Sequence, residues 1–318
     1  VAALGFTEVM SLPFASAEEL DQLQVLQDDP RRRMIRLANP LSETHPSLRT
    51  TLLPGLFAAI ARNTSRSLTD LALVEQGKAF FDGGEGAAPR PGVAHRPSEE
   101  DISAIDAAIP AQPHTVAAVV TGNWRPAGWA GPAVAADWTH VVALAEAAAA
   151  AVGVRLARRN VEMAPWHPGR CAELSVNGIV LGYAGEVHPA VVASLRLPER
   201  VAAVEFNLDL LLSQAAPGGS IGPLSSFPLA KEDVALIVDR DVPSAEVEAA
   251  LAEGAGDLLE SISLFDVYTG DQVGEGKKSL AFALRFRGDR TLTDADAAGA
   301  RQAAVAVAVE RFGAVQRA

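Results

Sequence analysis

Two neighbouring stretches near the end of the chain carry the clearest fold signal. The first is Leu264-Phe-Asp-Val-Tyr-Thr-Gly270, and the second is Lys278-Ser-Leu-Ala-Phe-Ala-Leu-Arg-Phe-Arg287. In the second, large apolar residues alternate with small or basic ones: Leu280, Phe282, Leu284 and Phe286 against Ser279, Ala281, Ala283, Arg285 and Arg287. Successive side chains of a strand point to opposite faces, so this alternation predicts a half-buried antiparallel strand.

The second face of this strand is small and basic, which favours RNA as a partner. Small side chains leave room for a flat base, and arginine suits phosphate. From Lys277 to Arg290 there are five basic residues and one acidic residue, a local net charge of +4. A strand face whose charges simply meet solvent is the alternative interpretation, and the pattern alone leaves both open.

The last part of the chain, residues 224–318, is predicted to be a ferredoxin-like βαββαβ domain. The expected elements are strand 232–238, helix 244–255, strands 259–268 and 279–287, helix 294–312 and a short strand near Val315. Pro243-Ser244 and Thr293-Asp294 are plausible helix starts. In this topology the first strand lies beside the third, and the second and third form a hairpin. Ala235, Asp266 and Ser279 therefore fall on three neighbouring strands and can face away from the helices.

The larger region, residues 1–215, mixes helices with short strands. Helices are expected near 48–63 and 141–152, with strands near 71–81, 115–121, 173–176, 179–186 and 201–207. Asn177-Gly178 is a good hairpin turn between two of these strands. Several strands with few intervening helices predict an antiparallel sheet flanked by helices, hence an α+β fold.

Two segments interrupt this pattern. Residues 82–114 are rich in Gly, Pro and charge, and are expected to be a long surface loop or flexible insertion. Residues 215–223 have the composition of an interdomain linker.

Composition narrows the class of protein. A formal net charge of −12 argues against nucleic-acid binding through bulk electrostatics, although it leaves local recognition open. The single cysteine, Cys171, excludes an intramolecular disulfide and a cysteine-rich zinc site, and is consistent with a reducing cytoplasm. The longest apolar runs, such as 141–154, are too short and alanine-rich to span a bilayer. A cytoplasmic protein with neither a membrane nor a DNA partner is expected.

Six further strings, in this order, point to a known family. They are Gly5-Phe-Thr-Glu-Val9, Asn39-Pro-Leu-Ser42, Leu48-Arg-Thr-Thr-Leu-Leu-Pro-Gly-Leu56, Glu75-Gln-Gly-Lys-Ala-Phe80, His167-Pro-Gly-Arg-Cys-Ala172 and Gly182-Tyr-Ala-Gly-Glu-Val-His-Pro189. With the C-terminal motifs they cover essentially the whole chain, which resembles the C-terminal portion of the β subunit of bacterial phenylalanyl-tRNA synthetase. The resemblance implies a class II synthetase-like, non-catalytic core domain in residues 1–215 and a ferredoxin-fold anticodon-binding domain in residues 224–318. The family's N-terminal modules have no counterpart here, so the chain is expected to be a piece of a longer protein.

The resemblance also implies partners and site residues. The chain would scaffold the catalytic α subunit in an α2β2 assembly and bind the tRNA for phenylalanine. ATP and Mg²⁺ would serve the assembled enzyme, with no cofactor in this chain. By motif, Ala235, Asp266 and Ser279 align with positions that contact the anticodon in this family. Lys278, Arg285 and Arg287 are the RNA-binding cations expected beside them.

One departure concerns the first strand, where the family usually carries an Arg-Asp pair. Lys231-Glu-Asp233 keeps the aspartate but separates it from the basic residue. The inter-subunit surface is expected at the helical segment 48–61 and the apolar strand 71–81, since class II folds pair through this region.

No catalytic residue and no metal site is expected. A class II active site needs arginines on its motif-2 strand and late in its sheet to hold ATP phosphates, and the strands at 75–81 and 182–188 offer none. His167 and His188 precede prolines without a Cys, Asp or Glu at ligand spacing, which favours turns over metal ligands. Cys171 is either a low-pKa thiol or, as is commoner for a lone cysteine, a small packed side chain.

Two other functions stay open. A free-standing ligase built on the larger domain would bind phenylalanine and ATP without a partner. A ferredoxin-fold interaction module with no RNA role would lack salt-dependent tRNA binding.

Overall fold

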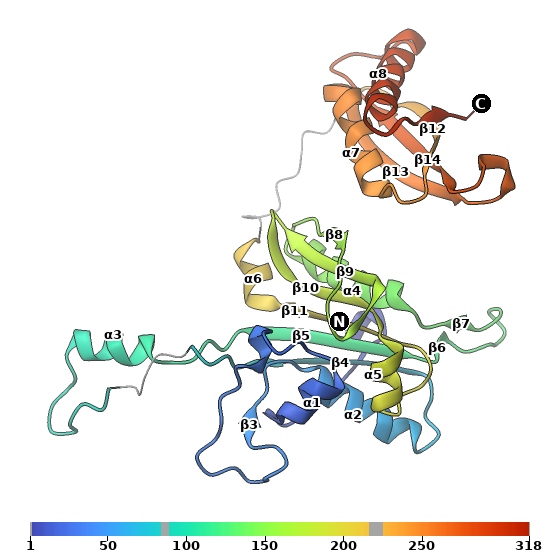
Figure 1. The fold of residues 1–318 in the computed structure, drawn as a ribbon. Helices are drawn as coiled ribbons and strands as arrows, with labels where there is room; N and C mark the ends of the chain where they lie inside the picture. Colours follow the sequence, from blue (N-terminus) through green and yellow to red (C-terminus); the bar gives the residue numbers. More distant parts are fainter. Residues whose placement is uncertain (1, 84–88, 216–224, 318) are drawn as a thin grey trace. The chain divides into compact units, whose positions relative to one another are not determined.

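The computed structural model describes residues 2–83, 89–215 and 225–317. The chain divides into two compact units, residues 1–219 and 220–318 (Figure 1). The predicted linker at 215–223 lies, apart from Ala215, outside the described residues.

The larger unit is built on a seven-stranded sheet. Its strands in spatial order are β1 (Thr7–Glu8), β4 (Leu71–Lys78), β5 (His114–Thr121), β11 (Val201–Asn207), β10 (Ile179–Val187), β9 (Trp166–Val176) and β8 (Ala157–Asn160). Every neighbouring pair is antiparallel except β1 and β4, which are parallel. Asn177 and Gly178 join β9 to β10 with φ of 51° and 79°, the left-handed conformations that a tight hairpin turn requires. The predicted α+β class is confirmed.

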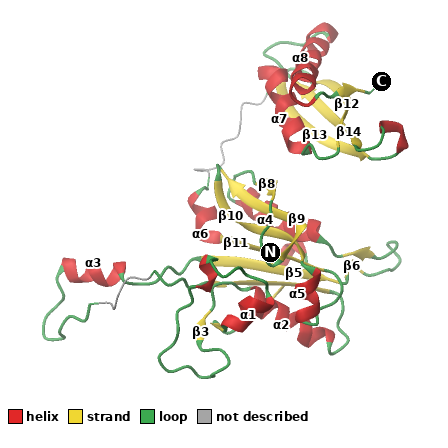
Figure 2. Cartoon of the chain, in the orientation of Figure 1, coloured by secondary structure: helices red, strands yellow, loops and turns green. Residues whose placement is uncertain are grey.

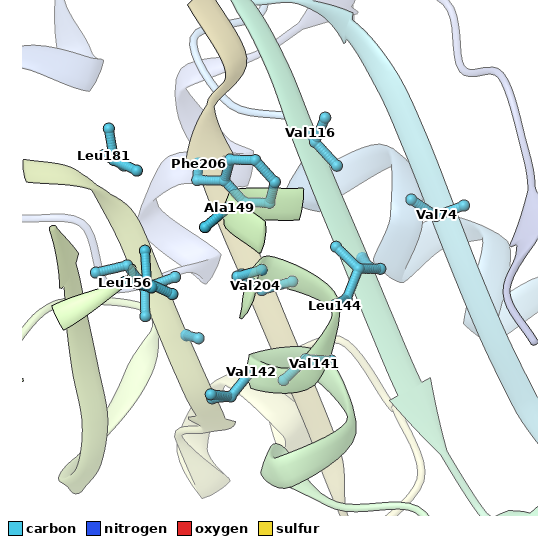
Figure 3. Close-up of a cluster of buried hydrophobic side chains, with 14 of the residues drawn as sticks. Val74, Val116, Val141, Val142, Leu144, Ala149, Leu156, Leu181, Val204 and Phe206 are labelled. Atoms are coloured by element: carbon cyan, nitrogen blue, oxygen red, sulfur yellow. The ribbon is translucent and has the colours of Figure 1, made fainter. Parts of the chain in front are cut away.

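Helices cover both faces of this sheet. On one face α4 (Trp138–Ala151) packs on alternate residues of the central strands, and Figure 3 shows Val141 and Leu144 in the same buried cluster as Val116 and Val204. On the other face lie α1 (Ala17–Gln22), α2 (Leu53–Thr64) and α5 (Pro189–Ser194). The helix α2 buries Leu53, Leu56, Phe57 and Ile60, a spacing that places all four side chains on one face. Each such side chain contributes about 1.5–3 kcal/mol by leaving water.

Other elements of this unit are short. They are α6 (Leu208–Ser213) and the two-stranded pairs β2 (Phe14–Ala15) with β3 (Ser47–Leu48), and β6 (Asn123–Arg125) with β7 (Val134–Ala135).

The segment 82–114 is not only a loop, because it contains the helix α3 (Glu99–Ala107). Ser98 Oγ accepts from the Asp101 N–H, and the Asp101 carboxylate accepts from the Ser98 N–H, which forms a capping box. The expectation of a long surface loop or flexible insertion is therefore wrong for residues 99–107, which form a helix, while residues 84–88 lie outside the described part.

The second unit has the predicted ferredoxin-like βαββαβ order. Its elements are β12 (Ala230–Asp239), α7 (Ser244–Ala255), β13 (Leu259–Tyr268), β14 (Lys277–Phe286), α8 (Asp294–Phe312) and β15 (Val315–Gln316). The antiparallel sheet runs β13-β14-β12-β15, so β12 lies beside β14 and β13–β14 is a hairpin, as predicted.

Both helices of this unit lie on one side of its sheet (Figure 2). They approach each other closely at Gly254, where an added Cβ would come within 2.6 Å of the Ala303 carbonyl oxygen. Val234, Leu236 and Val238 of β12 point to the helices, together with the four large apolar residues of β14. Among the described residues no helix covers the other side, which is called the open face below.

Candidate nucleic-acid interface

The open face brings together the three residues that sequence motifs single out. Asp266 of β13 and Ala235 of β12 are both direct cross-strand partners of Ala281 on the strand between them. Ser279 lies two residues along β14 from Ala281, on the same side of the sheet. The methyl groups of Ala235, Ala281 and Ala283 form a low floor across β12 and β14.

A β-bulge puts Asp266 on this face. Leu264 is opposite Phe282 and Asp266 is opposite Ala281, so Phe265 is an extra residue between them. Without the bulge, Asp266 would follow Ile262 and Leu264 towards the helices. Phe265 itself is 59% exposed beside the floor.

The Asp266 carboxylate is available to a ligand. Its side chain is exposed and makes no hydrogen bond or ion pair with any described residue. A free carboxylate can accept hydrogen bonds from the N–H groups on the Watson–Crick edge of a base such as guanine.

Ser279 is much less accessible than its sequence position suggests. It is only 4% exposed, and its direct cross-strand neighbours on the open face are Tyr268 of β13 and Ile237 of β12. A base could reach the Ser279 hydroxyl only after neighbouring side chains move.

Tyr268 and Arg317 are open-face residues that sequence reasoning missed. The Arg317 guanidinium lies over the Tyr268 ring, with Cζ 5.5 Å from the ring centroid. Arg317 Nη2 donates to Gln272 Oε1 at 2.7 Å, and the Arg317 N–H donates to the Ala235 carbonyl at 2.8 Å. A tyrosine ring can stack on a base, but Arg317 covers one face of this ring. The available signal was the spacing, since Tyr268 follows Asp266 by two residues along a strand.

The predicted cations are largely neutralised within the chain. Arg285 Nη1 lies 3.4 Å from Asp233 Oδ1, and Arg287, just beyond β14, donates to Glu260. That hydrogen bond raises the pKa of Arg287. The other ion pairs in this stretch are Lys277 with Asp239 and Arg290 with Asp296. The local net charge of +4 therefore overstates the positive potential on this face. Four carboxylates from outside residues 277–290 pair with these cations and offset their charge.

Lys278 does not share the open face. Its cross-strand partner is Val238, which points to the helices, and alternation places the two on the same side. Partial burial lowers the pKa of Lys278. The structure thus separates Lys278 from Arg285, with which the sequence grouped it.

In the larger unit the two His-Pro histidines have structural roles. His188 Nδ1 accepts from the Ala190 N–H and caps α5, while His167 Nδ1 accepts from the Gly169 N–H, both at 3.1 Å. Cys171 is buried, and burial raises the pKa of its thiol to about 12, so it is a packed side chain rather than a reactive thiol.

The expected inter-subunit surface is mostly internal. Leu52, Leu53 and Phe57 lie in this chain's own core. The strand β4 is inside the sheet, with β1 hydrogen-bonded along one edge and β5 along the other. Two exposed apolar side chains lie nearby, Met10 and Leu12, which are 94% and 76% exposed. These two residues and the outer face of α2 line a surface hollow of about 300 Å³.

Comparison with known proteins agrees with this arrangement. The family model for the phenylalanyl tRNA synthetase beta chain CLM domain matches residues 1–208, and the model for the ferredoxin-fold anticodon binding domain matches residues 225–317. The chain belongs to the phenylalanyl-tRNA synthetase β chain family. Among the described residues, no helix has the length and hydrophobicity to cross a membrane.

Individual relatives extend over the whole chain. Phenylalanine–tRNA ligase beta subunits of Cutibacterium acnes, Streptomyces avermitilis and Thermobifida fusca are 56%, 51% and 48% identical to it. Each alignment covers 100% of this chain but only 38%, 39% and 39% of the respective relative. The chain therefore spans about two fifths of the length of these relatives, and its place in their C-terminal portion stays a prediction. A solved pyrrolysyl-tRNA synthetase from Desulfitobacterium hafniense matches with a TM-score of 0.45 and 12% identity over 66% of this chain and 63% of its own, too weakly to support an argument.

Proposed function

We propose that this chain is a non-catalytic part of a phenylalanine–tRNA ligase β subunit, and that its second unit binds the tRNA anticodon during attachment of phenylalanine to its tRNA. The observation that carries the proposal is the unpartnered Asp266 carboxylate beside the methyl floor, on the open face of a unit that matches an anticodon-binding family.

The geometry suggests how a base is read. A splayed base lies on the methyl groups of Ala235 and Ala281, where Asp266 accepts from its edge. Tyr268 offers a ring for stacking, worth about 1–3 kcal/mol for one base. Arg285 exchanges Asp233 for a phosphate group, which adds affinity without sequence preference.

The larger unit is proposed to dock the catalytic α subunit in an α2β2 assembly. Met10 and Leu12, two of the exposed apolar side chains of this unit, are proposed to make that contact, because obligate interfaces bury apolar surface. ATP and Mg²⁺ would be bound by that partner, and the assembly would work in the cytoplasm.

The α2-covered side of the large sheet does not suit phosphates. Two arginines on this side, Arg31 and Arg49, are already paired with Asp29 and Glu75, and Glu205 adds a further negative charge. Adenylate chemistry in this chain is therefore not proposed.

The RNA proposal is tested by fluorescence anisotropy with a labelled anticodon stem–loop. The chain should prefer the phenylalanine anticodon over the same RNA with its first anticodon base replaced, and should lose affinity as salt rises. Absence of any RNA binding would favour the interaction-module alternative. Phenylalanine-dependent pyrophosphate exchange by the chain alone would favour the free-standing ligase.

The scaffold proposal is tested by co-expression with an α subunit. Leu12→Asp should abolish co-purification, while Val93→Asp, at a fully exposed apolar side chain in the 82–114 segment, should not. Unchanged co-purification of Leu12→Asp would remove this surface as the docking site.

A further inference from the structure

The larger unit contains a pocket that the RNA-binding face does not use. It has a volume of about 260 Å³ and lies on the α2-covered side of the sheet, at the ends of β4, β10 and β11. The residues that matter for its chemistry are Asp29, Arg31, Met163, Trp166, Tyr183 and Glu205.

Glu205 brings an unbalanced carboxylate to this pocket. Its Oε2 accepts from Thr51 Oγ1 and its Oε1 accepts from the Leu52 N–H, both at 2.7 Å. Both donors are neutral groups, and burial raises the pKa of the carboxyl. A carboxylate withdrawn from water without a cationic partner is costly, so it favours an added cation or a proton.

The nearby arginines do not provide that cation. Arg31 Nη2 lies 2.7 Å from Asp29 Oδ2, and Arg49 Nη1 lies 2.5 Å from Glu75 Oε1. Two guanidinium groups against three carboxylates, counting Glu205, leave a net charge of −1. One positive charge would balance the group.

The side chains that line the pocket indicate the chemical nature of the uncharged part of the ligand. The Trp166 and Tyr183 rings lie 5.9 Å apart between centroids, and the Trp166 indole N–H is already bonded to the Ala203 carbonyl. Met163 and Phe81 complete an apolar lining. Aromatic and thioether groups favour a flat apolar body, and aromatic faces also attract cations.

We propose that this pocket binds a small organic cation, a primary amine with a flat apolar group, whose ammonium pairs with Glu205 while its body lies against Trp166 and Tyr183. The site is independent of RNA binding and of the chemistry of any partner subunit. Its volume sets the ligand below drug size, since drug-sized pockets begin at about 300 Å³.

Phenethylamine is a suitable probe, titrated into the whole chain by calorimetry at pH 7.5. Phenylacetate and benzyl alcohol serve as the anionic and neutral analogues. We expect saturable binding of the amine, with affinity at least about tenfold higher than for either analogue, the value of one charge-assisted hydrogen bond.

Glu205→Gln should weaken binding of the amine by about tenfold or more, whereas Glu186→Gln, at a partly exposed carboxylate on the same sheet that is paired with Arg170, should leave the affinity unchanged. Should Glu205→Gln fail to fold, Tyr183→Leu and the pH dependence of the unaltered chain replace it. The amine affinity should fall as the pH drops through the raised pKa of Glu205, because the neutral acid no longer attracts the ammonium. The proposal is overturned by absence of saturable amine binding, by equal binding of phenylacetate, or by an affinity that neither variant nor pH alters.

Discussion

The carboxylate of Asp266 lies on the open face, opposite the methyl group of Ala281, and has no hydrogen-bond or ion-pair partner among the described residues. Replacing it with alanine should remove about 1–3 kcal/mol of preference between the phenylalanine anticodon and its first-base variant, by analogy with base-edge readout in DNA. Anisotropy titrations of both RNAs measure this preference directly.

Two matched variants separate the preference for one anticodon from the overall affinity for RNA. Asp233→Ala releases Arg285 and should strengthen binding to both RNAs alike, while Arg285→Ala should weaken both and flatten the salt dependence. Ser279→Ala should reduce the preference only if the covering side chains move on binding, since that residue is 4% exposed. A preference unchanged within about twofold in Asp266→Ala would leave Asp266 as an ordinary strand residue.

Cys171 supports a second prediction, because it is the only thiol in the chain. Burial raises its pKa to about 12, so almost no thiolate is present at pH 8. Reaction with Ellman's reagent should therefore be negligible in the native chain and rapid in denaturant. Fast stoichiometric labelling of the native chain would show that β9 opens readily at this point.

At the scale of elements, periodicity predicted much of the second unit correctly. Helices at 244–255 and 294–312 and the strand at 259–268 have the predicted bounds, since apolar period and cap residues are both local signals. The side of the sheet that Asp266 faces was harder to predict. It depends on the bulge at Phe265. The bulge arises from pairing with β14, and no local sequence pattern indicates it.

Charge and exposure were the least predictable properties. Arg285 pairs with Asp233 across a sequence separation of 52 residues, and Arg287 pairs with Glu260 across 27. A count along the strand cannot include carboxylates that only folding brings near. By contrast, the missed helix α3 had a local signal, the capping residues Ser98 and Asp101.

The start of α8 gives a prediction on stability against pH. Thr293 caps the helix, and Asp296 accepts from Arg290 and from the Thr293 N–H, which lowers its pKa. A lowered pKa stabilises the folded state fully above the unfolded value of about 3.9, and that contribution is lost as the pH falls through the folded pKa. Asp296→Asn should therefore lower the Tm of the second unit at pH 7, with the gap to the unaltered chain narrowing below about pH 4.

Circular dichroism melts at pH 7 and pH 3 would measure that gap. Asp294→Asn, in the same helical turn but outside the capping box, should change the Tm less. A gap for Asp296→Asn that is equal at both pH values would mean that the side chain acts without its charge.

At the scale of the whole molecule, we expect no adenylate formation by this chain alone. Arg31 and Arg49, on the α2 side of the large sheet, are held by Asp29 and Glu75, so neither guanidinium is free to stabilise charge at phosphorus. Phenylalanine-dependent pyrophosphate exchange should therefore be absent from the chain free of α subunit. Exchange above background, in a preparation shown by mass spectrometry to lack α, would contradict this assignment.

The central claim is that the open face of the second unit meets the anticodon. Its most direct test places a photo-crosslinking p-benzoylphenylalanine at Phe265, an exposed aromatic position beside Asp266, and at Gln302 on the exposed side of α8 as the control. After irradiation with the tRNA for phenylalanine, the crosslinked nucleotides are mapped by primer extension. We expect crosslinks to the anticodon loop from position 265 and no such crosslinks from position 302. Crosslinks from 265 elsewhere in the tRNA, or anticodon crosslinks from 302 alone, would contradict it.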